Sequence, residues 1–138
     1  MSKKPSKKPL IVLVHSPSFL RRWMERSLGE QYRVRSFSNS EKALASVRSI
    51  HYLDLLITEL DLVGSVLGGC NIAREVKQRF PKTPILVFLD TRSGDHRVEL
   101  LSGMERVRFI SKPWDAIFIG RNVATVLAKE GTDEASYE

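Results

Sequence analysis

Short apolar runs alternate along the chain with segments of helical periodicity. The run at 10–14 is uninterrupted and rich in β-branched residues, which is typical of a strand buried on both faces. From Phe19 onward, apolar residues recur at helical spacing with charged residues between them, and Gly29 marks the end of that segment. The same analysis predicts strands at 10–14, 32–37, 53–60, 84–89 and 107–111, and helices at 19–28, 41–47, 72–80, 96–101 and 114–129.

Five strands alternating with five helices predict an α/β fold with a single, doubly wound, five-stranded parallel sheet. The functional crevice of such a sheet lies at the carboxyl ends of its strands. That rule selects the candidate site before any motif is considered. The residues selected are His15, Ser16, Glu59, Leu89, Asp90, Ser111, Lys112 and Pro113.

The chain of 138 residues has the size of one compact domain. We expect a basic tail at 1–8, a folded body at 9–129 and an acidic tail at 130–138. The single cysteine, Cys70, excludes an internal disulfide and fits a reducing compartment, so a cytoplasmic location is expected. The apolar runs are too short for a membrane span, so no membrane insertion is expected.

The net charge is +6, which raises the question of a nucleic-acid partner. The charges of the two tails cancel, and the basic residues of the body are scattered rather than gathered in a stripe with aromatic residues. A solvated basic surface explains this pattern better than a nucleic-acid interface does, so the pattern argues against nucleic acid as a partner.

Three segments carry a family resemblance over about 9–129. They are 54–62, with Glu59 at the end of a strand, the apolar strand at 84–88, and 109–113, with a Lys-Pro pair. In this order and spacing the chain resembles the receiver domain of bacterial response regulators. The resemblance implies the flavodoxin-like strand order 2-1-3-4-5, and it places Glu59 where the family has its phosphoacceptor aspartate.

An active receiver needs an aspartate nucleophile, an acidic pair that holds Mg²⁺, a lysine and a Ser or Thr hydroxyl. Of these, the chain keeps only Lys112. His15 and Ser16 stand at the acidic positions, and Leu89 stands at the hydroxyl position. Mg²⁺ prefers oxygen ligands, so we expect no metal, no cofactor and no catalysis. The resemblance is therefore to a degenerate receiver, or pseudo-receiver.

Glu59 leaves two interpretations open. Its extra methylene displaces the carboxylate from the position that in-line phosphoryl transfer requires. Its permanent charge, with Lys112 in reach, would suit a constitutive mimic of the phosphorylated state. A plain structural ion pair is the alternative.

Two further predictions concern the last strand and helix. Phe109 matches the family's aromatic switch position, although a packed strand aromatic is the alternative. The final helix has more apolar residues than one buried stripe requires, so Trp114, Phe118 and Ile119 are candidate interface residues. The resemblance implies that the face formed by helix 4, strand 5 and helix 5 binds a signalling protein or a second copy of the chain.

These observations favour a phosphorylation-independent protein-interaction module in bacterial signalling. One alternative is a receiver that is phosphorylated on an unusual acceptor. A second is a small basic nucleic-acid-binding domain.

Overall fold

A computed structural model describes residues 8–62, 68–89, 96–111 and 114–131. Residues 1–7 of the predicted basic tail, residues 132–138 of the predicted acidic tail, and Asp90, Lys112 and Pro113 lie outside the described residues. The elements in chain order are β1 (Leu10–Val14), α1 (Phe19–Leu28), β2 (Arg33–Phe37), α2 (Ser40–Ser49), β3 (Leu55–Glu59), α3 (Gly68–Arg79), β4 (Ile85–Leu89), α4 (His96–Ser102), β5 (Val107–Ser111) and α5 (Ala116–Gly131).

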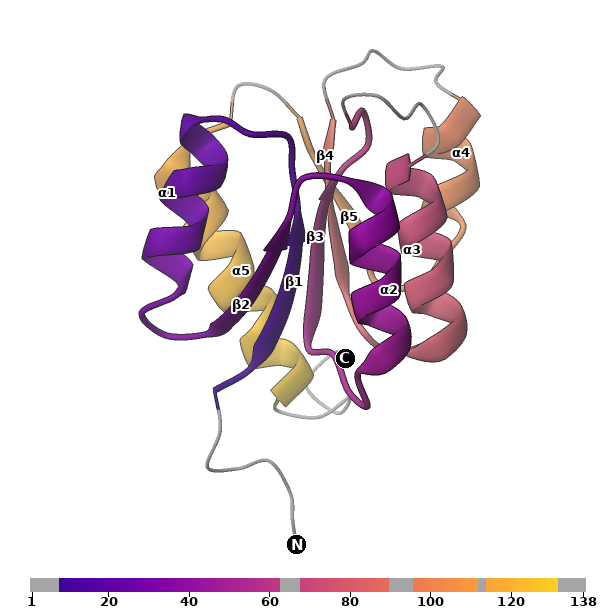
Figure 1. Cartoon of the computed structure of the whole chain (residues 1–138), viewed down its shortest axis with the longest axis horizontal. Helices are drawn as coiled ribbons and strands as arrows, with labels where there is room; N and C mark the ends of the chain where they lie inside the picture. The colour runs from indigo at the N-terminus through magenta and orange to yellow at the C-terminus, as the bar shows by residue number, and fades with distance from the viewer. Residues whose placement is uncertain (1–7, 63–67, 90–95, 112–113, 132–138) are drawn as a thin grey trace, which may run out of the picture.

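The five strands form one parallel sheet in the order β2-β1-β3-β4-β5, which confirms the predicted fold and strand order. Helices α1 and α5 cover one face of the sheet, and α2, α3 and α4 cover the other (Figure 1). The β1, β3 and β4 strands are apolar on both faces because both are covered, as parallel sheets require.

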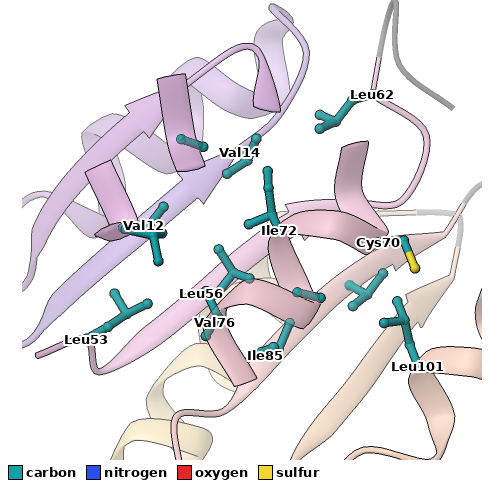
Figure 2. Close-up of a cluster of buried hydrophobic side chains, with 14 of the residues drawn as sticks. Val12, Val14, Leu53, Leu56, Leu62, Cys70, Ile72, Val76, Ile85 and Leu101 are labelled. Carbon is teal, nitrogen blue, oxygen red and sulfur yellow. The ribbon is translucent and has the colours of Figure 1, made fainter. Parts of the chain in front are cut away.

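Each face of the sheet has its own hydrophobic core. The first core lies under α2, α3 and α4, and Figure 2 shows its side chains meeting between the helices and the strands. The thiol of Cys70 is buried in this first core, as expected for a small apolar residue. The second core lies under α1 and α5 and includes Leu13, Ile57 and Phe88. Alternate residues of each central strand point to the two cores because side chains alternate across a strand.

Helix boundaries follow local capping chemistry. The hydroxyl of Ser18 accepts the backbone N–H of Arg21 at the start of α1, and the side chain of Asn39 accepts that of Lys42 at the start of α2. The carboxylate of Asp115 accepts the N–H groups of Ile117 and Phe118. This cap starts α5 at Ala116, so the expected start at 114 was wrong.

The glycine-rich segment at 63–69 was predicted to be a loop. Gly68 and Gly69 are instead buried in the first turn of α3, and 63–67 lie outside the described residues. A Cβ built on Gly69 would lie 2.1 Å from the backbone oxygen of Glu59, so only glycine lets α3 approach β3 this closely.

Among the described helices, none is long and apolar enough to cross a membrane.

We predict that Gly69→Ala destabilises the protein by about 2 kcal/mol or more, because the new methyl group meets backbone atoms that cannot move aside. Gly120→Ala in α5 is the matched control. Apart from its chain neighbours and the backbone of its own helix, no atom of the described residues lies within 4 Å of a Cβ built there, so we expect unchanged stability or a gain of up to about 1 kcal/mol. Urea unfolding of both variants measures the difference, and equal stabilities would contradict the close packing of α3 on β3.

Candidate functional site

The register between β1 and β3 brings His15 and Glu59 together. Val14 lies opposite Thr58, so the next residue of each strand, His15 and Glu59, lie side by side at the carboxyl edge of the sheet. Leu13 and Ile57, two positions earlier, belong to the second core. His15 and Glu59 therefore lie on the same face of the sheet, the one covered by α1 and α5.

The imidazole of His15 is enclosed by aromatic rings. The residue is 2% exposed, and its ring meets those of Phe88 and Trp114 edge to face, with centroid separations of 5.7 and 5.9 Å. Nδ1 lies 3.0 Å from the backbone oxygen of Ser16. A carbonyl only accepts, so Nδ1 is the donor in this contact. The ring is thereby held in a fixed orientation.

The carboxylate of Glu59 is held on the β1 side of the site. Its Oε1 accepts the backbone N–H of Ser16 at 2.7 Å, and its Oε2 lies 3.5 Å from Nε2 of His15. The second contact has ion-pair distance if His15 is protonated. It lacks hydrogen-bond geometry, and Nε2 has no hydrogen-bond partner among the described residues. The Ser16 bond is therefore the stronger constraint on Glu59, whose side chain is 12% exposed.

The other carboxylates of this part of the chain are engaged elsewhere. Asp61 accepts from Nη2 of Arg97 at 2.7 Å, which ties the end of β3 to α4. Asp54 accepts the backbone N–H of Leu10 at the opposite end of the sheet. Each of these carboxylates thus bonds a group outside the set of His15, Ser16 and Glu59.

These side chains do not fit Mg²⁺, the ion that the family resemblance implies. The positions expected to carry an acidic pair hold a buried imidazole and Ser16, and Glu59 is turned toward both of them. Mg²⁺ requires several oxygen ligands in near-octahedral geometry. In the described part of the chain, no three His, Cys, Asp or Glu side chains form a group that could hold a metal ion.

Two other predicted site residues lie on the opposite face of the sheet. Leu89, at the end of β4, and Phe109, in β5, are both half-buried and pack against the first core. The structure brings together His15, Ser16 and Glu59, but it does not place Leu89 and Phe109 with them.

The candidate interface residues divide into three environments. Trp114 is half-buried, packs against the second core and donates its indole N–H to the backbone oxygen of Ile110 at 3.2 Å. Ile119 is fully buried in the same core, so its assignment to an exposed interface was wrong. Its backbone N–H bonds to Asp115, and the resulting first turn of α5 points its side chain at the sheet. Phe118 is 52% exposed, as an interface residue would be.

Phe88 and Trp114 are parts of the site that the sequence analysis did not assign to it. Phe88 lies opposite Glu59 in the register of β3 and β4, so its position follows from the strand alignment. Side chains alternate between the two faces along β4, and Leu86 and Phe88 both belong to the second core. This alternation was the sequence signal that could have placed Phe88 on the face of Glu59. Trp114 is 55 positions after Glu59, and no local pattern linked it to His15.

Comparisons with known proteins agree with the fold. The family model for the response regulator receiver domain matches residues 11–123. A response regulator receiver protein from Sinorhizobium medicae is similar in structure, with a TM-score of 0.75 and 20% identity, and the match covers 89% of this chain and 97% of that chain. A CheY-like receiver domain from Methanospirillum hungatei has a TM-score of 0.77 and 14% identity, and the match covers 91% of this chain and 98% of that chain.

A chemotaxis protein of Vibrio cholerae gives a TM-score of 0.71 and 17% identity, with 86% of this chain and 98% of that chain covered. No match is found among curated proteins. Identities this low establish a shared fold, and the chemistry of the site must be argued from its own residues.

We predict that two substitutions of Glu59 differ in their effect on stability. Glu59→Ala removes the acceptor of the Ser16 N–H and should cost about 1 to 3 kcal/mol. Glu59→Gln keeps an acceptor oxygen on a side chain of the same length, so the loss of stability should be less than half as large. Urea unfolding at neutral pH compares the two. Equal losses would mean that the charge of Glu59, rather than its hydrogen bond, stabilises the site.

Proposed function

Because the chain belongs to the response regulator receiver domain family, we propose that it is a receiver module that works without phosphoryl transfer. Receiver domains are signalling modules, generally not enzymes, that interact with other signalling proteins or effector domains. The function that we propose for this chain is accordingly to bind a protein, in a state that phosphorylation does not control.

The placement of Glu59 carries this proposal. A carboxylate nucleophile must approach the phosphorus atom in line, and a cation must compensate the charge on the transferring group. Both oxygens of Glu59 face β1, one on the Ser16 N–H and the other beside His15. The imidazole in turn stands where a metal-binding carboxylate would be needed, and a buried aromatic wall holds it there.

The same contacts favour a structural role for Glu59 over mimicry of the phosphorylated state. A mimic would present its charge toward the fourth and fifth strands, where the family has its hydroxyl and its lysine. Glu59 instead directs both oxygens at the end of β1. Leu89, which stands at the hydroxyl position, packs against the first core and has no polar side-chain atom to offer.

Protein binding is proposed for the surface around the edge strand β5. Helices α4 and α5 flank this strand from the two faces of the sheet (Figure 1). They carry three large apolar side chains that are at least half exposed, Leu100, Ile117 and Phe118. Exposed apolar groups in such number on neighbouring elements are typical of surfaces that bind proteins.

We predict that neither Mg²⁺ nor beryllofluoride, which imitates an aspartyl phosphate, changes the amide spectrum of the protein. The amides of His15, Ser16 and Glu59 report on the site in an NMR titration, and a receiver with the usual acidic residues, treated in parallel, shows that the reagents are active. Shifts that saturate and cluster at these three amides would contradict the proposal.

We also predict that the proposed binding surface supports self-association. The sedimentation coefficient of the wild type should rise with concentration, and Ile117→Ser with Phe118→Ser should abolish the rise. Phe19→Ser is the matched control because Phe19 is 84% exposed on α1, outside this surface. A wild type that sediments as a monomer at every concentration, or a control that behaves like the double variant, would contradict self-association through α5.

A further inference from the structure

A pocket lies at the end of the sheet opposite Glu59. Its volume is about 290 Å³, near the lower limit for small-molecule sites. It lies where β1 and β2 begin and α2 ends, at the lower edge of the sheet in Figure 1. Its lining residues are Leu10, Arg33, Arg35, Ser49, Ile50, His51 and Tyr52.

The two arginines come from the side of β2 that should be apolar. Leu10 lies opposite Arg33, and Val12 lies opposite Arg35, and both of these β1 residues belong to the first core. Neighbours in a parallel sheet point to the same face. Arg33 and Arg35 therefore lie on the α2 face of an edge strand, where apolar side chains would otherwise extend the core.

No carboxylate of the described residues pairs with the charges of these arginines. Arg33 donates from Nη1 to the hydroxyl of Tyr52 at 2.5 Å, and neither Arg35 nor His51 has a side-chain hydrogen bond or ion pair with any described residue. No acidic side chain is among the described residues that line the pocket. Asp54, two residues after Tyr52, accepts the backbone N–H of Leu10.

The partial negative charge at the carboxyl end of α2 does not by itself account for two arginines at this position. The carbonyl end of a helix carries partial negative charge and attracts cations. A guanidinium that served this end would bond its free carbonyl groups. Neither Arg33 nor Arg35 makes such a bond in the described structure. Both guanidinium groups thus keep N–H donors available to a ligand.

We propose that this pocket binds a small phosphate monoester. A phosphate monoester has close to two negative charges at neutral pH, which matches two guanidinium groups, and their planar donor pairs suit phosphate oxygens. Leu10, Ile50 and the ring of Tyr52 form an apolar wall for the organic part of the ligand. The site is separate from Glu59, so its occupancy does not depend on the proposed loss of phosphoryl transfer.

The test is an NMR titration of the full chain with phenyl phosphate at constant ionic strength. We expect saturable shifts in the amides of 33–35 and 49–52, with the amides of His15, Ser16 and Glu59 unchanged. Phenol and inorganic phosphate, titrated separately, should each bind at least about tenfold more weakly, because each lacks one of the two groups that the pocket contacts.

Two charge-matched variants locate the binding. Arg35→Gln should weaken phenyl phosphate binding at least about tenfold, the usual scale of a lost charge-assisted hydrogen bond. Arg26→Gln removes the same charge from an exposed position on α1, across the sheet, and should leave the affinity within about twofold of wild type. Arg33→Gln is a second pocket variant should Arg35→Gln fail to fold.

Three outcomes would overturn the proposal. The first is the absence of saturable shifts, which would leave the arginines as cations beside the α2 terminus. The second is equal weakening by Arg35→Gln and Arg26→Gln, which would indicate general electrostatic attraction. The third is inorganic phosphate binding as tightly as phenyl phosphate, which would exclude a role for the apolar wall.

Discussion

The pairing of β1 with β3 is the constraint on which the candidate site depends. Parallel alignment of Val14 with Thr58 places the next residues, His15 and Glu59, beside each other at the carboxyl edge. The Ser16 N–H then bonds the Glu59 carboxylate across the two strands. In a receiver with acidic residues after β1, the same alignment would bring carboxylates together around a cation. Here the alignment brings an imidazole and one carboxylate together in place of the carboxylate pair that Mg²⁺ prefers.

The aromatic rings around His15 link the end of β1 to β4 and to the segment before α5. Phe88 comes from β4 and Trp114 from the segment before α5, and the two rings also contact each other with centroids 5.3 Å apart. Burial of these rings and of the imidazole stabilises the carboxyl edge through apolar packing, where an active receiver needs polar groups around a phosphoryl site. The match to the family therefore fixes the fold, and the residues at the edge determine what the fold does.

Much of the fold followed from the sequence because the signals were local. Uninterrupted apolar runs predicted the central strands, and helical spacing predicted the first two helices, whose caps the structure identifies as Ser18 and Asn39. The enclosure of His15 was not predictable in this way, since it depends on the register of β3 with β4 and on the path of the chain to Trp114.

Ile119 was assigned wrongly because the count of apolar residues in α5 did not reveal which of them face the sheet. The alternation in β2 was read correctly as a strand, but the position of Arg33 and Arg35 against the end of α2 appears only in three dimensions.

The most direct test of the account is incubation of the protein with acetyl phosphate and Mg²⁺, followed by intact mass spectrometry. The side-chain contacts of Glu59 predict no mass increase corresponding to a phosphoryl group, while a receiver with the usual aspartate gains one under the same conditions. A phosphoryl adduct that requires Mg²⁺ and is lost in Glu59→Gln would show that the site is a working phosphoacceptor and would contradict the account.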